Sequence, residues 1–574
     1  MSIDSVSTTG AEGAPVALRP TIQGTRHVVS SGHYLASQAA FEILEAGGNA
    51  IDAGVAAGLV TGVVQSEFVN IAGVAPIMIY LADRREVVTI TGLGVWPKAA
   101  TLDLFLDRCN GTIPTGVLRT VVPAAPDAWI TALERFGTMS FGEVARSAIR
   151  FAREGFAMYP ILADLLAVFQ DAYRTWSQNE AIYLPNGLPP KVGDLFVQSD
   201  LGRTLQYMVD QEQSAAKGNR IAGLSAARDA FYRGDIAKTI CDFHAREGGL
   251  MTREDMAGFR VDVEAPLRYR YRGKDVYTCQ PWCQGPTLIQ MLAILEGIDL
   301  SDLYHDGADY AHLLLETMKL VFVDRERHYA DPRHRAVPMD RLLSAAHNQA
   351  QRARIDRNRA RPYAELWAEP PVEGNKMKVP SLDTSYVAVI DRDGNAFSAT
   401  PSDVSYDTPV VPGTGLCPSS RGAQSWAVRG HPCEIAPGTR PRLTPAPAMA
   451  IDDTQIFAFG TPGGDVQCQA MLQVLLNVQQ WGMDLQQAIE APRVATFSFP
   501  DSFEPHTALP DRVLMEERLG TTVEAKLRDR GHDVGIWPPF TWRAGGVCAA
   551  VLDRRTGIRS GAADPRRACY AVGW

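Results

Sequence analysis

The sequence predicts an α+β fold in which β-sheets are sandwiched between layers of helices. Two observations lead to this prediction. The first two-thirds of the 574 residues show helical periodicity, whereas the last third is rich in strands, and a polar segment separates them. Candidate strands also occur near both ends of the chain, and each needs a partner. The simplest solution is one sandwich whose sheets take strands from both parts.

The elements of the first part follow in order. Helical periodicity covers 35–46 and stops at Gly47-Gly48, and Asn49 is a suitable N-cap for a helix that begins near residue 50. Alternating residues predict strands at 76–81 and 86–90. The same criteria predict helices at 124–136, 141–154, 201–211, 227–244, 287–296 and 310–328, with a strand region at 269–277.

The second part begins after a change in composition. Residues 351–380 lose the apolar period and are rich in Arg, Asn, Pro and Glu, so we expect a mobile linker that extends to residue 383. Strands at 384–390 and 395–400 then flank an Asp-Gly turn. The remaining predicted elements are a strand at 455–459, a helix at 465–481 and a hairpin of 547–552 with 558–562.

Composition and charge exclude several classes of protein. With 46% hydrophobic and 21% charged residues, the chain is neither disordered throughout nor collagen-like. Its formal charge of −9 gives no attraction for a phosphate backbone, so we expect no nucleic-acid partner. The nine scattered cysteines are typical of free thiols in a reducing compartment.

The N-terminal residues and the apolar runs predict a cytoplasmic protein without a membrane anchor. Residues 1–20 are rich in Ser, Thr, Gly and Ala, without a basic start and an apolar stretch, and are interpreted as a flexible tail rather than a signal peptide. The longest apolar run, 51–64, is too short to cross a bilayer and contains Asp52.

The chemistry is expected where the linker meets the strand. If the bond between Asp383 and Thr384 were cut, Thr384 would carry a hydroxyl and a free amine on adjacent carbons. A neutral α-amine, with a pKa of about 8, accepts the hydroxyl proton near neutral pH, so no histidine is needed. Gly463 and Gly464 lie between a strand and a helix, where backbone N–H groups can stabilise an oxyanion. Taken alone, these features equally describe a strand-forming threonine and a plain turn.

Seven segments, spread in order over nearly the whole chain, carry a family resemblance. They are GGNAIDAGVAAGLVTGVVQ (47–65), YRGDIA (232–237), GGLMTREDMAGF (248–259), LETMKLVFVDRERHYADP (315–332), TSYVAVIDRDGNAFSAT (384–400), GTPGGD (460–465) and GAADPRR (561–567). Together they resemble the γ-glutamyltranspeptidase family of N-terminal-nucleophile hydrolases. The stretch 420–448 is more similar to the branch that contains oxamate amidohydrolase and cephalosporin-acylase-type enzymes.

The resemblance implies a four-layer αββα sandwich and a proenzyme that cuts itself between Asp383 and Thr384. The flexible tail would be 1–20, the large subunit 21–383 and the small subunit 384–574. Thr384 would be the nucleophile, Ser402 would place a hydroxyl near its amine, and Gly463 and Gly464 would hold the oxyanion. No metal or organic cofactor is implied. The partners would be the two subunits of one precursor and a small amide, and a homo-oligomer of such heterodimers is compatible with the sequence.

The pocket departs from the transpeptidase pattern. The positions that hold a γ-glutamyl zwitterion in the family fall near Leu93, on Gln424 or Ser425, and on Val404 and Leu443. Because burying unpaired charges is costly, we expect a substrate other than a standard γ-glutamyl amide. Candidate substrate-binding residues are Thr444, Gln424, Arg421 and Arg442 for a carboxylate, and Trp426 for an apolar acyl group; the arginines and the tryptophan equally suit structural roles.

The sequence therefore predicts a self-processing threonine amidohydrolase. Two alternatives stay open: a γ-glutamyltransferase or glutathione hydrolase with an altered pocket, and a scaffold that keeps the fold but is never cut.

Overall fold

The computed structural model describes residues 17–368, 370–372 and 384–574. Asp383, the expected cleavage residue, lies outside the described residues, as does most of the predicted tail. The described end of that tail is attached to the body of the protein, because the Leu18 amide donates a hydrogen bond to Glu490 Oε2 over 2.6 Å.

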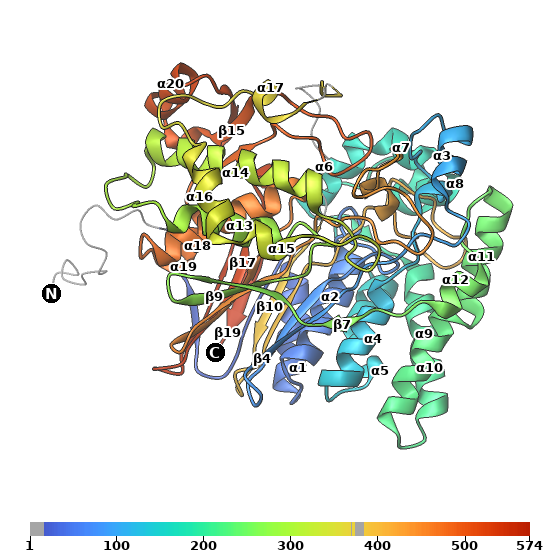
Figure 1. Ribbon diagram of the computed structural model, residues 1–574. Coiled ribbons are helices and arrows are strands. Elements are labelled where there is room, and N and C mark those ends of the chain that lie inside the picture. Colours follow the sequence, from blue (N-terminus) through green and yellow to red (C-terminus); the bar gives the residue numbers. More distant parts are fainter. Residues whose placement is uncertain (1–16, 369, 373–383) are drawn as a thin grey trace.

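Two seven-stranded antiparallel sheets stack at the centre of the molecule (Figure 1). The first has the order β19 (Tyr570–Gly573), β2 (Val28–Ser31), β10 (Val387–Ile390), β11 (Ala396–Ala399), β3 (Ile77–Leu81), β4 (Glu86–Ile90) and β7 (Val263–Glu264). The second has the order β1 (Ile22–Gly24), β18 (Arg559–Ala563), β17 (Cys548–Asp553), β13 (Gln455–Gly460), β12 (Ala448–Ile451), β9 (Lys274–Thr278) and β8 (Leu267–Tyr271). Strands β10 and β11 pair with β2 and β3, so the prediction that both parts of the chain share one sandwich is confirmed.

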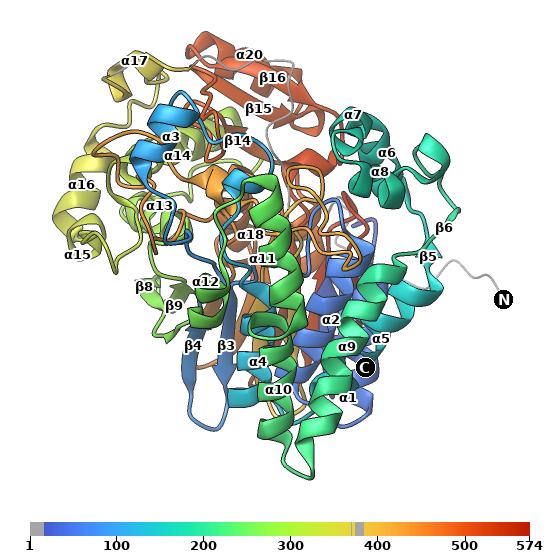
Figure 2. The same cartoon turned by 90° about the vertical axis from the view of Figure 1, so that its right-hand side faces the viewer.

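Helices cover the outer face of each sheet and complete the four-layer αββα architecture (Figures 1 and 2). Outside the first sheet lie α1 (Tyr34–Glu45), α2 (Ala50–Val64), α4 (Ala125–Phe136) and α5 (Phe141–Glu154), with α9 (Ser199–Ala216) and α10 (Arg220–Tyr232) packed beyond them. Outside the second sheet lie α13 (Pro286–Glu296), α14 (Ala308–His328), α18 (Gln467–Gln479) and α19 (Leu485–Glu490). The predicted fold class is therefore confirmed.

Helix α2 shows how the sequence builds this packing. Asn49 caps it, and the Asn49 backbone N–H donates to the Asp52 carboxylate, which completes a capping box. All fifteen residues of the helix are buried. A Cβ at Gly54 would lie 2.2 Å from the Phe397 ring, and one at Gly58 would lie 2.5 Å from the Trp129 ring. The two glycines thus let the helix lie directly on β11 and α4.

One predicted helix is wrong in detail, and a predicted strand region consists of two strands. The expected helix at 227–244 is two helices, α10 and α11 (Asp235–Glu247), which meet at Arg233-Gly234. The expected strand at 269–277 is the hairpin of β8 and β9, whose turn holds Arg272 and Gly273 at positive φ. In both cases a glycine interrupts a pattern that was interpreted as continuous.

The described part of the expected linker is packed against the body of the protein. It contains the end of α16 (Ala345–Ala353) and the short helix α17 (Tyr363–Leu366). The Tyr363 amide donates to Asp511 Oδ1 over 2.6 Å, and the Tyr363 and Leu366 side chains are buried. This order comes from contacts with distant residues, which local composition does not indicate.

A small third sheet was not predicted at all. It consists of β14 (Val494–Thr496), β15 (Arg512–Glu516) and β16 (Asp533–Trp537), with α20 (Thr521–Asp529) beside it. Further short helices are α3 (Leu102–Arg108), α6 (Pro160–Val168), α7 (Gln170–Arg174), α8 (Ser177–Tyr183), α12 (Arg253–Gly258) and α15 (Met339–Leu342). Within the described ranges, no helix combines the length and apolarity needed to cross a membrane.

Candidate active site

Thr384 lies three residues before β10 and is fully buried. Its N–H donates to the Phe68 carbonyl over 3.1 Å, and the Asp403 N–H donates to the same oxygen over 3.0 Å. Both residues have positive φ, +100° for Thr384 and +128° for Asp403. Such a conformation is strained for a β-branched residue and costs roughly 1–3 kcal/mol. The strain thus lies at the residue where cleavage is expected.

The Thr384 hydroxyl is held in a polar setting. Its Oγ1 lies 2.6 Å from Ser402 Oγ, and Gln467 Nε2 donates to it weakly over 3.4 Å. Arg421 Nη2 donates to Ser402 Oγ over 2.5 Å. Ser402 therefore already accepts one charge-assisted hydrogen bond, and its oxygen and hydrogen can each serve the threonine hydroxyl.

Backbone pairing places Ser402. Its N–H donates to the Val74 carbonyl over 3.0 Å, and the Val74 N–H donates back over 3.2 Å. The preceding Pro401 carbonyl accepts from the Ser385 N–H over 2.9 Å. The hydroxyl is thus fixed from both sides, next to the nucleophile.

Arg421 opens the 3₁₀ helix η3 (Arg421–Gln424) and is fully buried. Its Nε lies 3.6 Å from Asp403 Oδ2, and the Ser419 and Ser420 hydroxyls donate to the same carboxylate over 2.5 and 2.6 Å. Burial raises the pKa of Asp403 above its ordinary value, although Arg421 and these hydrogen bonds oppose the shift. The guanidinium is therefore shared between Asp403 and Ser402.

Gln424 and Thr444 extend the same network. Gln424 Nε2 donates to Thr444 Oγ1 over 2.9 Å, and its Oε1 accepts from Arg421 Nη1 over 3.5 Å. Gln284 Nε2 donates to the carbonyls of Thr444 and Gly464, each over 2.9 Å. One hydrogen-bond network thus joins Thr384, Ser402, Arg421, Gln424 and Thr444. Gln284 connects this network to the glycine loop.

Gly463 and Gly464 occupy the loop between β13 and α18. Their φ angles of +128° and +55° lie in the region that favours glycine. Gln467, the first residue of α18, contacts the Thr384 hydroxyl, which places this loop beside the nucleophile. The Asp465 carboxylate accepts from the Ser502 amide over 2.9 Å and pairs with Arg325, which fixes the loop.

Arg442 and Trp426 belong to a neighbouring cluster. Arg442 Nη2 donates to Glu326 Oε1 over 2.7 Å, and Arg325 Nε donates to the same oxygen over 2.9 Å. These guanidiniums outweigh the effect of burial and lower the pKa of Glu326 to about 2. Trp426 is stacked between His431 and His506, with ring centroids 4.1 and 3.7 Å away. The predicted contacts of Arg442 and Trp426 with the substrate stay predictions.

Three of the transpeptidase zwitterion positions are occupied by apolar residues. Leu93, Val404 and Leu443 are all buried in the body of the protein, with exposed fractions of 1%, 6% and 0%. None of these side chains can pair with a carboxylate or an ammonium group. The apolar residues at these positions agree with the expectation of a different acyl group.

Three residues that the sequence reasoning missed also shape the site. Gln467 reaches the nucleophile, Gln284 braces the glycine loop, and Asp403 shares the Phe68 carbonyl with Thr384. Gln467 follows the glycine pair by three residues at the start of a predicted helix, so its position was a usable signal. The other two depend on contacts between distant segments.

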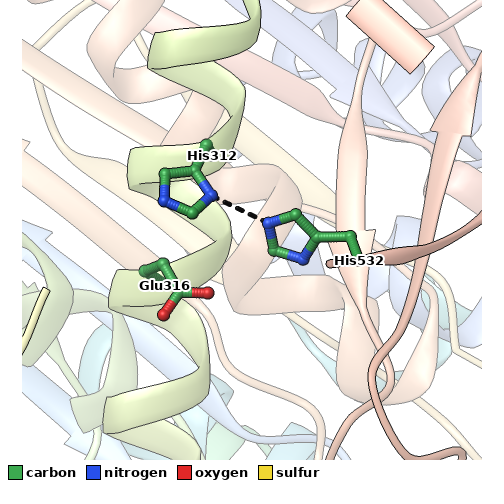
Figure 3. A group of neighbouring side chains, drawn as sticks. All are labelled: His312, Glu316 and His532. Carbon is green, nitrogen blue, oxygen red and sulfur yellow. Dashed lines mark hydrogen bonds between the residues drawn. The ribbon is translucent and has the colours of Figure 1, made fainter. Parts of the chain in front are cut away.

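One described cluster has the composition of a metal site. His312 Nδ1 and His532 Nε2 lie 2.8 Å apart, with Glu316 one turn further along α14 (Figure 3). His312 Nε2 lies 2.8 Å from the Asp356 carbonyl, to which it donates, while Glu316 pairs with Lys319. Because these ligand atoms already have protein partners and Lys319 adds a positive charge, we assign no metal to the cluster.

A buried threonine at the start of a central strand of an αββα sandwich, with a glycine loop beside it, defines the class of N-terminal-nucleophile hydrolases. The sequence model described as Gamma-glutamyltranspeptidase matches residues 36–574. The chain therefore belongs to the γ-glutamyltranspeptidase family of these enzymes.

The chain is similar over nearly its full length to two kinds of family member. It is 33% identical to the Acylase ACY 1 proenzyme of Pseudomonas sp. (strain SE83), covering 94% of this chain and 92% of that protein. It is 30% identical to the glutathione hydrolase proenzyme of Bacillus subtilis (strain 168), covering 96% and 92%. The crystal structure of cephalosporin acylase from Bacillus halodurans matches with a TM-score of 0.85 and 26% identity, over 99% of both chains. The expected similarity to the acylase branch is confirmed.

Proposed function

We propose that this protein is a self-processing amidohydrolase in which Thr384 first cuts its own chain and then attacks a small amide. The observation that carries the proposal is the buried contact of the Thr384 hydroxyl with Ser402, beside the glycine loop. The full-length similarity to proteins described as proenzymes supports it.

Self-cleavage would follow from this geometry. The Thr384 oxygen attacks the carbonyl carbon of residue 383, the C–N bond breaks, and the hydroxyl proton ends on the new amine. Water then hydrolyses the resulting ester, which leaves chains 1–383 and 384–574. In the mature protein the free amine takes the hydroxyl proton as Thr384 Oγ1 attacks the amide carbonyl of the substrate, and Gly463 and Gly464 hold the oxyanion. The amine then gives this proton to the substrate nitrogen, the C–N bond breaks, and the amine product leaves an acyl-enzyme. Water or an amine acceptor releases the acyl group.

A denaturing gel with intact-mass analysis tests the cleavage. The wild-type chain should give two bands, and Thr384→Ala should give one band near 62.5 kDa. A wild-type chain that stays whole after long incubation would leave the uncut scaffold as the better description.

The substrate is tested separately by comparing kcat/KM for glutathione, oxamate and glutaryl-p-nitroanilide. Because buried apolar Leu93, Val404 and Leu443 stand at three of the zwitterion positions, glutathione should be the poorest of the three. Preferred turnover of glutathione would instead support the glutathione hydrolase alternative. The similarity to the glutathione hydrolase proenzyme of Bacillus subtilis is the reason to test it.

We also propose a cytoplasmic location, because all nine cysteines are unpaired and eight are buried. Fractionation of the source cells checks this, and recovery of the chain outside the cytoplasm would contradict it.

A further inference from the structure

Two buried ionisable side chains, Glu67 and Arg567, lie next to Phe68, whose carbonyl accepts the Thr384 N–H, and take no part in the chemistry proposed above. Glu67 is fully buried a short distance after α2, and Arg567 is 5% exposed at the end of the motif 561–567. A charge that is removed from water needs a partner, so each of these groups has to be accounted for.

The Arg567 guanidinium has an unused fork of donors. Its Nε donates to the Trp542 carbonyl over 3.2 Å, and its plane lies over the Phe68 ring, 4.6 Å from the centroid. Nη1 and Nη2 are buried and have no hydrogen-bond partner among the described residues. Two parallel N–H donors of this kind match the two oxygens of a carboxylate.

Glu67 adds a second unused group. The Tyr159 hydroxyl donates to its Oε1, while Oε2 is buried without a partner in the described part of the chain. Burial raises the pKa of Glu67 to about 8, although Tyr159 and the nearby Arg567 oppose the shift. At neutral pH the carboxyl is therefore mostly protonated, and its O–H can donate to an anion.

Arg567 lies near two parts of the candidate site. The Phe68 ring beneath it belongs to the residue whose carbonyl accepts the Thr384 N–H over 3.1 Å. Along the Arg567 stem, a Cβ at Gly546 would lie 2.7 Å from Arg567 Cδ and 3.3 Å from Pro462, which precedes Gly463. The guanidinium therefore lies against the residue that anchors the nucleophile, and the stem of the same side chain lies near the residue that precedes the glycine loop.

The other candidate arginines have anionic partners within the protein. Arg421 is shared with Asp403 and Ser402, and Arg442 pairs with Glu326. An unpaired buried guanidinium is costly, and a bound anion removes that cost.

Resting on the proposed function, we propose that Arg567, assisted by Glu67, binds a carboxylate on the acyl part of the substrate. The substrate class is then an amide of a dicarboxylic acid, or of another acyl group that ends in a carboxylate. Thr384 and Arg567 are both buried in the uncut chain, so the binding experiment uses protein that a gel shows to be cut.

Isothermal titration with glutarate and pentanoate tests the assignment, because the two differ by one carboxylate. The purified wild-type chain should bind glutarate at least tenfold more tightly than pentanoate. Arg567→Met should remove this preference, Arg567→Lys should keep part of it, and the exposed control Arg555→Met should keep all of it. Succinate and adipate would show which acyl length fits.

Equal binding of glutarate and pentanoate to a cut wild-type chain would overturn the carboxylate site and leave the nucleophile proposal standing. A preference that survives in Arg567→Met would also overturn it. If Arg567→Met fails to fold, the wild-type comparison and Arg567→Lys decide the matter. A chain that the gel shows to be uncut contradicts the proposed function instead, so the two failures are distinguishable.

Discussion

At the residue scale, the Phe68 carbonyl positions two residues of the site. It accepts the N–H groups of Thr384 and Asp403, two residues at positive φ that come from the two ends of the β10–β11 hairpin. One oxygen therefore holds the nucleophile and the carboxylate that pairs with Arg421. Movement of either residue would break a hydrogen bond in a buried setting, which keeps the strained geometry in place.

Ser402→Ala should slow self-cleavage by about tenfold to a hundredfold, because it removes the hydroxyl between Arg421 and Thr384. The measurement is the rate at which the 384–574 chain appears on a gel after refolding. Ser405→Ala is the matched control, since that buried hydroxyl bonds to Tyr173. Equal rates in the two variants would contradict a role for Ser402.

The pH dependence of turnover should report the Thr384 amine. The base is active when neutral, so kcat/KM should fall about tenfold per pH unit below the pKa of the amine, which is about 8 for a free terminus. The profile is measured with the best of the three substrates compared above. A flat profile down to pH 5 would exclude the amine as the base.

The sequence could offer Thr384, Gly463 and Gly464 as candidates because their residue types are tied to local motifs, and their catalytic roles stay predictions. It could not predict that Arg421 and Arg442 already have acidic partners, since Glu326 is more than a hundred positions away from Arg442. Arg567 was missed for the same reason, because its lack of a partner is a property of the folded chain.

At the scale of elements, α2 depends on two glycines that allow contact with its neighbours. Gly54→Ala should lower the free energy of unfolding by about 1–3 kcal/mol, because its Cβ would overlap the Phe397 ring. Urea unfolding of uncut Thr384→Ala protein measures the change. Gly258→Ala, in α12 with open space around it, should leave stability unchanged or slightly raised. A similar loss in both variants would argue against the packing explanation.

The contact of α14 with the segment before β16 should make stability sensitive to acid. Burial lowers the pKa of His312 to about 4 and that of His532 to about 2, against 6.5 when unfolded. The unfolded chain therefore binds more protons, and stability should fall as the pH drops below 6.5, by about 1.4 kcal/mol per pH unit for each proton.

Urea unfolding at several pH values compares His532→Asn with the exposed control His334→Asn. The slope between pH 6.5 and 4 should be flatter in the first variant and unchanged in the second. Equal slopes in both would show that the buried pair does not govern the acid response.

Local patterns also set the limit of prediction for elements. The hairpins around residues 391–394 and 554–557 were found because their turns are local. The break at Gly234 was missed because apolar spacing continues across it. The order of α17 was missed because it depends on contacts such as that of Tyr363 with Asp511.

At the scale of the whole molecule, the expected cleavage would divide a sheet rather than separate two domains. Strand β10 lies between β2 and β11, and β11 lies between β10 and β3. The small subunit should therefore stay bound to the large one after cleavage, held by backbone hydrogen bonds on both sides.

Size-exclusion chromatography checks this expectation. Wild-type protein that a gel shows to be cut should elute at the same volume as uncut Thr384→Ala and should separate only in denaturant. Two peaks under native conditions would contradict the shared sheet.

The burial of Thr384 has a consequence for the life of the processed protein. Most new chain ends produced by proteolysis are exposed, where aminopeptidases can trim them. The end formed here would lie inside the molecule, at the residue whose N–H donates to the Phe68 carbonyl. A large exopeptidase cannot reach such a position, so the residue that performs the reaction is protected from removal for as long as the two chains remain folded together.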